Sequence, residues 1–382
     1  MNSILYNQTL PENNKASWKE FENIDFVFNF ENQALLANTI RFEADIQVFK
    51  DATNRVSTGD NITLDPKIGG HGVIQSVTTS FQTKGILENL TDYPRLVKMR
   101  TDAQNTADNM LDSNHVCELR APDESISPLL LYVKTPKIFG GGGLGNVNLA
   151  VDNNIIDPDF SIKPHICINN VYSDNKKISF SQSGSIRISL ILERDLGVLS
   201  GSDMAVTSHY TLSNCRMTFQ TVQDISPLPI ELRSSLCLKS NLSSAFNNVS
   251  SNVPAVSDSV SISFIKQTNE YSLGVNNTKL EQPPNITRLS YLYNDNTNRL
   301  ITYELKNRTD MLYRGLQSLN FTSQTSVNLE NIQANKSYLL GLRWSSPVSL
   351  ANNKFNIQLT TDISSTDQYV MFSYFHSILN FD

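Results

Sequence analysis

Strict alternation of apolar and polar side chains is the feature that most limits what this chain can form. In TIRFEADIQVF, residues 39–49, five apolar side chains share one face of an extended chain, and four polar ones share the other. The apolar positions are Ile40, Phe42, Ala44, Ile46 and Val48, and the polar positions are Arg41, Glu43, Asp45 and Gln47. Successive side chains point to opposite faces only in a β-strand, so the pattern predicts a strand with one buried face.

The same period recurs along most of the chain and predicts an all-β fold with few short helices. Further stripes lie at Ile24–Phe30, Val73–Phe81, Ile186–Leu192, Cys215–Phe219, Val260–Phe264, Leu289–Tyr293, Tyr338–Trp344 and Phe355–Leu359, before a final apolar run at Tyr369–Phe381. Two helices are expected. The longer covers residues 91–111, where Thr91 or Asp92 can cap the first turn and Pro94 suits it, and the shorter covers residues 307–319.

The alternation stops at residues 238–259, which read LKSNLSSAFNNVSSNVPAVSDS. A polar stretch rich in Ser and Asn, without periodicity, is typical of a linker or long loop. We therefore expect a first β domain over residues 1–224, a linker or long loop over residues 225–259, and a second β domain over residues 260–382.

The two halves repeat one order of elements at similar spacing. VIQSVTTSFQTKGILENLTDYPRLVKMR, which starts at Val73, predicts strand, turn, short strand and helix. ITRLSYLYNDNTNRLITYELKNRTDMLYRGL, which starts at Ile286, predicts the same sequence of elements. Two related β-sandwiches would produce this repeat, and so would coincidence.

The glycine-rich stretch FGGGGLGNVNLAVDNN, residues 139–154, matches the G-x-G-x-x-G spacing of a dinucleotide-binding loop at Gly140, Gly142 and Gly145. Such a loop must lead into a helix, whose free N–H groups bind the pyrophosphate. Here Val147, Leu149 and Val151 alternate with other residues, which predicts a strand instead. The glycines are therefore interpreted as a flexible connection or a close backbone approach.

Other chemical motifs are incomplete. His115 and Cys117 form a pair, but a zinc site needs three or four ligands. Asp152, Asp157 and Asp159 offer oxygen ligands without the spacing of an EF-hand loop, and an ordinary turn explains them better.

Glu193 and Asp195 lie beside a strand, and a solvated strand end is the favoured interpretation of this pair. A glycosidase would need two carboxylates opposed across a sugar, which one sequence does not reveal. We expect no catalytic, cofactor-binding or metal-binding residue, and hence no enzyme.

Net charge, hydropathy and cysteine content limit the classes of function that the chain can have. The formal net charge is −6 and the isoelectric point is about 5.5, so no basic stripe suggests direct nucleic-acid binding. No stretch approaches the roughly 20 apolar residues of a membrane span. The cysteines are widely spaced and are expected to be buried free thiols. They are Cys117, Cys167, Cys215 and Cys237.

Several stretches resemble the penton (minor capsid) proteins of Sputnik-like virophages. They are GGHGVIQSVTTSFQTKGILENLTDYPRLVKMR, SIRISLILERDLGVLSG with HYTLSNCRMTFQTV, and NKFNIQLTTDI with YFHSILNF. The resemblance covers most of the chain and rests on general character and on the order of strands and helix, without a short diagnostic motif.

The resemblance implies a jelly-roll β-sandwich as the first domain, followed by a second β-sandwich or barrel domain. It further implies a homopentamer at the fivefold vertices of an icosahedral virion, in contact with neighbouring major capsid protein capsomers and made in the host cytoplasm. On this interpretation residues 1–224 lie in the shell, and the second domain projects outward or caps it.

Three alternatives stay open. A small double jelly-roll major capsid protein would explain the repeat between the halves. A carbohydrate-binding adhesin or spike would carry exposed aromatic side chains clustered at one loop end, whereas Trp344 continues an apolar stripe and is expected to be buried. A β-sandwich hydrolase would need convergent carboxylates in a cleft.

Overall fold

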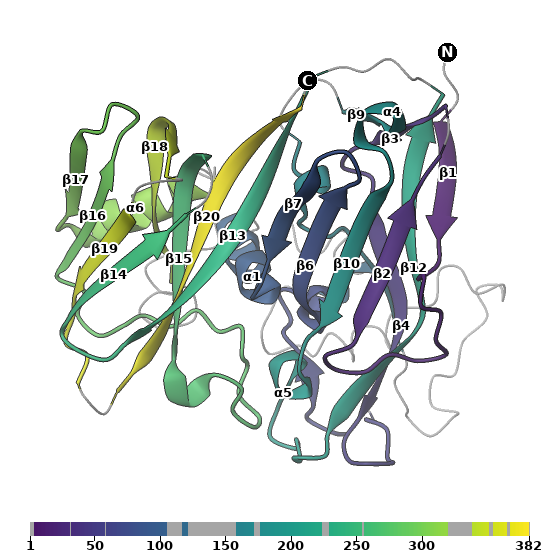
Figure 1. Cartoon of the computed structure of the whole chain (residues 1–382). Coiled ribbons are helices and arrows are strands. Elements are labelled where there is room, and N and C mark those ends of the chain that lie inside the picture. Colours follow the sequence, from purple (N-terminus) through teal and green to yellow (C-terminus); the bar gives the residue numbers. More distant parts are fainter. Residues whose placement is uncertain are drawn as a thin grey trace.

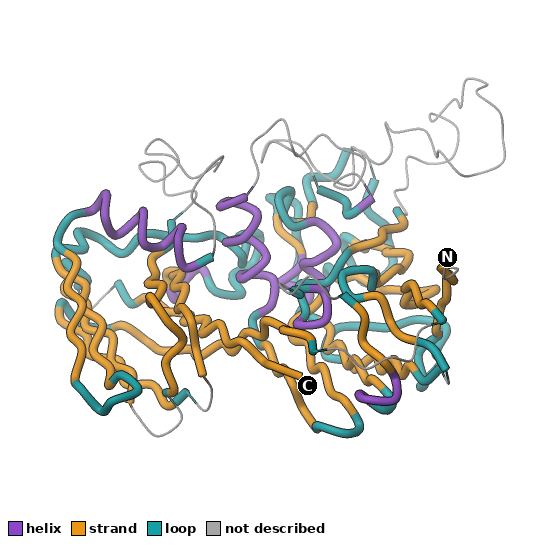
Figure 2. The backbone as a smooth tube through the Cα atoms, turned by 90° about the horizontal axis from the view of Figure 1, so that it is seen from above, coloured by secondary structure: helices purple, strands orange, loops and turns teal. Residues whose placement is uncertain are grey.

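The computed structural model describes most of the 382-residue chain. The described residues are 4–30, 32–57, 59–104, 117–120, 158–171, 176–223, 229–253, 256–319, 338–350, 354–364 and 367–381. Strands dominate this part of the chain, and they form two groups that lie side by side, with helices between them and along one side (Figures 1 and 2).

The first group contains two antiparallel sheets that face each other. One sheet runs in the order β1 (Ile4–Thr9), β12 (His209–Val222), β4 (Arg41–Phe49) and β8 (Asp159–Ile162). The end of β12 also pairs with β3 (Ala34–Leu36), which pairs with β9 (Lys177–Ser179). The facing sheet runs in the order β2 (Asn23–Phe28), β10 (Ile186–Leu192), β6 (Ile74–Phe81) and β7 (Gly85–Leu90).

The second group repeats this plan after residue 229. One sheet runs β13 (Ile230–Leu242), β20 (Tyr369–Phe381), β15 (Val256–Lys266) and β18 (Leu340–Ser349). The other runs β14 (Phe246–Asn252), β19 (Lys354–Thr360), β16 (Arg288–Asn294) and β17 (Leu300–Leu305). The two-stranded pair of β5 (Thr63–Leu64) and β11 (Leu199–Ser200) completes the described sheets.

Both groups have the strand order of a jelly roll. If the eight main strands of each group are numbered along the chain, one sheet has the order 1-8-3-6 and the other the order 2-7-4-5. A helix lies between the fifth and sixth strands in both, namely α1 (Tyr93–Gln104) and α6 (Arg308–Ser318). The all-β prediction is confirmed, and the repeat seen in the sequence corresponds to strands β6 and β7 with α1, and to β16 and β17 with α6.

The predicted stripes form the cores. Phe42, Ala44, Ile46 and Val48 of β4 are buried, and the polar residues between them are half-buried on the outer face. In β12 the buried positions change parity, from Tyr210 and Leu212 to residues 215, 217 and 219. The ladder to β4 shifts its register between Ser213 and Arg216, where Asn214 has a φ of 51°. This bulge inserts one residue and moves the following side chains to the opposite face.

The helices agree with the sequence where they are described. Helix α1 begins at Tyr93 within the predicted 91–111 range, of which residues 105–111 lie outside the described part. Helix α6 begins after Asn307, whose side chain accepts a hydrogen bond from the N–H of Thr309 at 2.9 Å. None of the helices in the described part is long and apolar enough to cross a membrane.

The remaining helical segments in the described part of the chain are short. They are α4 (Phe180–Ser183), α5 (Asp195–Val198) and the 3₁₀ turns η1 (Gly69–Val73), η3 (Cys167–Asn169) and η4 (Gln267–Asn269).

The expectation of a linker over residues 225–259 is wrong from Ile230 onward. This segment contains β13, β14 and the start of β15. Several of its serines, including Ser235, Ser251, Ser257 and Ser259, are buried strand residues, whereas Ser243, Ser244 and Ser250 are exposed. One face of the sheet that contains β13 and β15 is lined by hydrogen-bonded hydroxyl groups. Ser235 contacts His376 Nδ1 at 2.9 Å, Ser261 contacts His376 Nε2 at 2.9 Å, and Ser261 contacts Ser318 of α6 at 2.8 Å. Hydropathy cannot recognise a strand whose buried face is polar.

Gly341 of β18 offers a test of how tightly α6 packs on this sheet. A Cβ atom on Gly341 would lie 2.6 Å from the backbone oxygen of Val260 and would also collide with the Ser318 hydroxyl. Gly341→Ala should therefore lower the free energy of unfolding by about 1–3 kcal/mol. Gly59→Ala is the control, because no atom of the described residues lies within 4 Å of a Cβ at that position. Equal stability of the two variants in urea denaturation would contradict the packing.

Candidate functional site at the junction of the two jelly rolls

Helix α1 carries several charged side chains, yet it is buried between the two jelly rolls (Figure 1). Arg95, Lys98, Arg100 and Asp102 expose 3%, 1%, 8% and 0% of their surface. The sequence had indicated burial only for an apolar stripe on this helix. Charged groups are stable in such a place only when each has a partner, so the partners define a candidate site.

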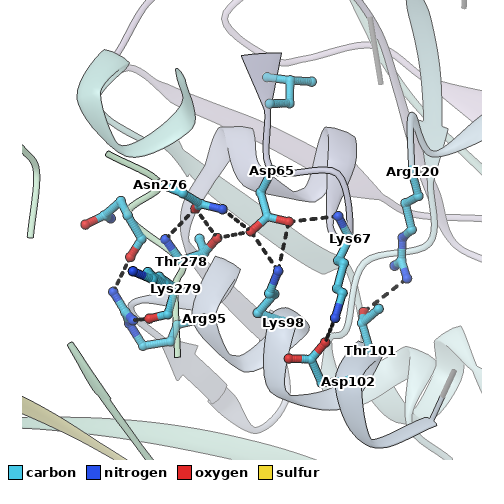
Figure 3. Close-up of polar contacts among 12 residues, drawn as sticks. Asp65, Lys67, Arg95, Lys98, Thr101, Asp102, Arg120, Asn276, Thr278 and Lys279 are labelled. Carbon is cyan, nitrogen blue, oxygen red and sulfur yellow. Dashed lines mark hydrogen bonds and ion pairs between the residues drawn. The ribbon is translucent and has the colours of Figure 1, made fainter. Parts of the chain in front are cut away.

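Asp65 is the centre of these contacts and joins both halves of the chain (Figure 3). From the first jelly roll it accepts hydrogen bonds from the ammonium group of Lys98 at 3.1 Å and from the backbone N–H of Lys67 at 2.8 Å. From the second jelly roll it accepts hydrogen bonds from the side-chain amide of Asn276 at 2.8 Å and from the hydroxyl of Thr278. One carboxylate therefore fixes the position of the 276–278 segment against helix α1.

The charge state of Asp65 follows from these donors. Burial alone would raise the pKa of this carboxyl, but the Lys98 ammonium and the donors of Thr278 and Asn276 lower the pKa to about 2. A second ion pair lies beside it, between Lys67 Nζ and Asp102 at 2.8 Å. The junction therefore contains ionised groups in a place from which water is largely excluded.

Arg95 makes a second connection between the halves. Its guanidinium group donates to the backbone oxygen of Lys279 at 2.9 Å and to that of Asn277 at 2.5 Å (Figure 3). The same group lies 4.3 Å from the centre of the Phe372 ring of β20. A planar guanidinium can form in-plane hydrogen bonds and stack on a ring at once, which an ammonium group cannot do.

Glu88 of β7 forms a third connection. One carboxylate oxygen accepts the N–H of Cys167 at 2.7 Å, and the other accepts the N–H of Ser235 in β13 at 2.9 Å. Burial raises the pKa of Glu88 to about 7, although both N–H donors favour the ionised form. An edge strand of the first jelly roll is thus tied to the first strand of the second.

A buried histidine network supports α1 from its other side. His71 Nδ1 lies 2.7 Å from the Tyr93 hydroxyl, which also accepts the backbone N–H of His165 at 3.0 Å. His71 Nε2 lies 3.6 Å from Glu118, and Glu118 pairs with Arg120 at 3.0 Å. Burial lowers the pKa of His71 to about 4, so the ring is neutral near pH 7.

The glycine-rich stretch 139–154 lies outside the described residues, and so do His115, Asp152 and Asp157. The expectation of burial is wrong for the free cysteine Cys117, which is exposed, whereas Cys167, Cys215 and Cys237 are buried free thiols. Within the described part of the chain, no group of three His, Cys, Asp or Glu side chains is arranged to hold a metal ion.

The interpretation of Glu193 as part of a solvated strand end is wrong. Its side chain is 2% exposed, and burial raises its pKa to about 7. Asp195 is half-buried and accepts the backbone N–H of Tyr210 at 3.0 Å. The chain folds back over these residues through Tyr210, whose hydroxyl donates to the Glu193 backbone oxygen at 2.6 Å.

The junction can hold two jelly rolls in one fixed orientation, because its charged groups are buried and satisfied by groups from both halves. Sequence reasoning missed this site. The available signal was the distribution of charge in PRLVKMRTDA, where charged residues occupy several faces of one helix. A helix that lies on a core with one face in water keeps its charges on that face.

The buried ion pair gives a first test. Lys98→Ala removes the cation beside Asp65 and should lower the free energy of unfolding by about 3–5 kcal/mol, because it leaves a buried carboxylate without its counter-ion. Arg187→Ala is the control, since the Arg187–Glu12 pair at 2.6 Å is about half exposed. The control should lose less than about 1 kcal/mol in the same urea titration. Similar losses in both variants would contradict the assigned role of Lys98.

The carboxyl of Glu88 gives a pH test. Its pKa in the folded chain, about 7, is above the ordinary value of 4.5, so its contribution to stability is complete below pH 4.5 and is lost as the pH rises to 7. The shift corresponds to at most about 3 kcal/mol. Glu88→Gln should flatten the decline in unfolding free energy between pH 5 and pH 8, and Glu12→Gln should not.

Glu193 also contributes to the loss of unfolding free energy at alkaline pH, because its pKa is raised to about 7 as well. Part of that loss therefore remains in Glu88→Gln. His71 acts in the opposite direction. Its folded-state pKa of about 4 lies below the ordinary 6.5, so stability falls as the pH drops from 6.5 to 4. An unchanged alkaline decline in Glu88→Gln would show that Glu88 does not titrate in this range.

No protein-family model and no curated protein sequence matches the chain. Solved structures do match it over nearly its whole length. A chain of the Sputnik virophage structure determined by cryo-EM matches with a TM-score of 0.57 at 9% identity, covering 99% of this chain and 86% of that one. The Faustovirus major capsid protein matches at 0.53 and 10% identity, covering 100% and 90%. The mavirus major capsid protein matches at 0.51 and 11%, covering 98% and 88%. At these identities the likeness shows the fold alone, and it extends across both jelly rolls.

Proposed function

We propose that this chain is a structural subunit of an icosahedral virus capsid, and specifically a double jelly-roll major capsid protein. The observation that carries the proposal is the presence of two jelly rolls with the same strand order, held together by a buried junction. The major capsid proteins of Faustovirus and mavirus have this fold over the full length of the match.

The number of jelly rolls favours a position with six neighbours. Three copies of a chain with two similar jelly rolls present six similar units around a ring, which suits the hexagonal positions of a shell. Five copies would present ten units at a vertex with five neighbours. Each contact between copies would be heterologous, with one patch of a subunit against a different patch of the next.

A penton subunit is the second candidate, and the resemblance of the sequence to virophage penton proteins favours it. In that role residues 1–224 would lie in the shell, residues 260–382 would project or cap it, and the chain would form a homopentamer among major capsid capsomers. In either role the protein belongs to the virion, is made in the host cytoplasm and uses neither a catalytic residue nor a cofactor.

The adhesin alternative has little support in the described residues. Trp344 is 7% exposed, as the sequence predicted. The large exposed aromatic side chains, Tyr6, Phe21, Phe246 and Tyr313, come from separate parts of the fold and do not form a cluster at one loop end.

Native mass spectrometry of the purified protein tests the proposal. We expect an assembly of three times the 42.8 kDa chain mass. An assembly of five times that mass would favour the penton candidate over the major capsid protein. A reconstruction of particles should place the chain at hexagonal positions, and density for it confined to fivefold vertices would contradict our assignment.

A further inference from the structure

Helices α1 and α6 occupy the same place in their jelly rolls but differ in exposure. Each begins three residues after the end of the fifth strand, α1 after Leu90 and α6 after Leu305. Every described side chain of α1 from Tyr93 to Ala103 is buried, whereas Arg308 and Tyr313 of α6 are exposed. The difference has a simple cause, because the second jelly roll covers α1 and nothing in the chain's described part covers the outer side of α6.

The cover over α1 comes from defined strands of the second jelly roll. Its first strand, β13, donates the N–H of Ser235 to Glu88 of β7 at 2.9 Å. Its last strand, β20, donates the Tyr374 hydroxyl to the backbone oxygen of Asp92 at 2.8 Å. Phe372 of β20 stacks beneath Arg95. The fifth strand and helix of one jelly roll are thus covered by the first and last strands of the next.

The corresponding surface of the second jelly roll is open. It lies at the end of the molecule formed by β16, β17, β18 and α6 (Figure 1) and contains a cavity of about 540 Å³. Tyr293, Tyr303, Arg314 and Trp344 contribute to its lining. Among the described residues, no hydrogen-bond partner within normal geometry meets the buried Trp344 Nε1–H. At the rim, Leu300 and Tyr313 are 63% and 47% exposed. We call this surface the α6 face.

The corresponding strand of the first jelly roll is also uncovered. Strand β1 lies at the opposite end of the molecule from β17 (Figure 1) and pairs only with β12 among the described strands. Ile4, Leu5 and Tyr6 are 52%, 36% and 81% exposed, and Leu10, just after the strand, is 58% exposed. Apolar side chains gathered on a free edge strand are a liability unless a partner covers them.

We propose that strand β1 of a second copy of this chain binds the α6 face, as β13 binds β7 beside α1 within one copy. Counted back from the strand ends, Tyr303 stands at the position of Glu88, and it contributes to the lining of the cavity on the α6 face. The proposal rests on the proposed assembly from several copies and adds to it the two surfaces that meet.

Charged groups on both surfaces already have partners within the chain. Arg314 of α6 pairs with Asp310 at 3.4 Å, and Glu43 of β4 pairs with Arg216 at 2.6 Å. The proposed contact therefore rests on the exposed apolar side chains of the two surfaces. The contact is heterologous, so repeated contacts close a ring where the rotation between successive copies closes and extend into a filament where it does not.

Two substitutions test the surfaces separately. Tyr6→Asp alters β1, Tyr313→Asp alters the α6 face, and Val206→Asp is the control at a site that is 87% exposed in the turn before β12. Sedimentation velocity should show that the first two variants need a concentration roughly tenfold or more higher for half-assembly. The control should match the wild-type protein. Unchanged thermal melting of the dilute proteins verifies that each variant folds.

Mixing the two variants tests the direction of the contact. Tyr6→Asp protein retains an intact α6 face and Tyr313→Asp protein an intact β1, so the mixture should form a 1:1 dimer and no larger ring. Assembly of both variants like the wild-type protein, or the absence of any mixed dimer at high concentration, would overturn the proposed contact. These outcomes differ from failure of the proposed function, which would appear as a wild-type protein that does not form three-copy assemblies.

Discussion

The burial of a charged helix is the constraint on which the two-part structure depends. Helix α1 places Arg95 and Lys98 where water does not reach, and their partners come from both jelly rolls. Asp65 alone accepts hydrogen bonds from Lys98, Asn276 and Thr278. Without either half, these charged groups would be exposed to water or would lack their partners, so the two jelly rolls behave as one structural unit. An ionic junction also tolerates little sliding, because each donor must meet its acceptor within hydrogen-bond distance.

The two jelly rolls share a strand order but have different outer faces, and the difference follows from position. The sheet with β4 has charged, half-buried side chains outside, where Arg216 pairs with Glu43 at 2.6 Å. The equivalent sheet with β15 faces the junction and α6, and it presents buried Ser261, His376 and Tyr374. A face within the chain requires fixed partners for its polar groups, whereas a face at the surface can rely on water. The same contrast separates buried α1 from exposed α6.

Buried titratable groups limit the pH range over which this fold is most stable. Burial raises the pKa of Glu88 to about 7 and lowers that of His71 to about 4. Each shift favours the neutral form, so alkali charges a carboxylate and acid charges an imidazole in places without water. Stability should therefore be greatest in weakly acidic solution, where both groups are neutral in the folded chain.

The sequence alone determined the all-β class, most strand positions and helices α1 and α6, because period-two alternation and capping residues act locally. It did not reveal β13 and β14 as strands or Ser261 as a buried residue. A serine is buried where the fold places a partner such as His376 within hydrogen-bond distance of its hydroxyl group. The sequence also assigned α1 an apolar stripe but missed the burial of Lys98 and Asp65, whose partners lie in distant segments. Tertiary structure decided these points because the stability of a buried polar group depends on which groups the fold brings within hydrogen-bond reach.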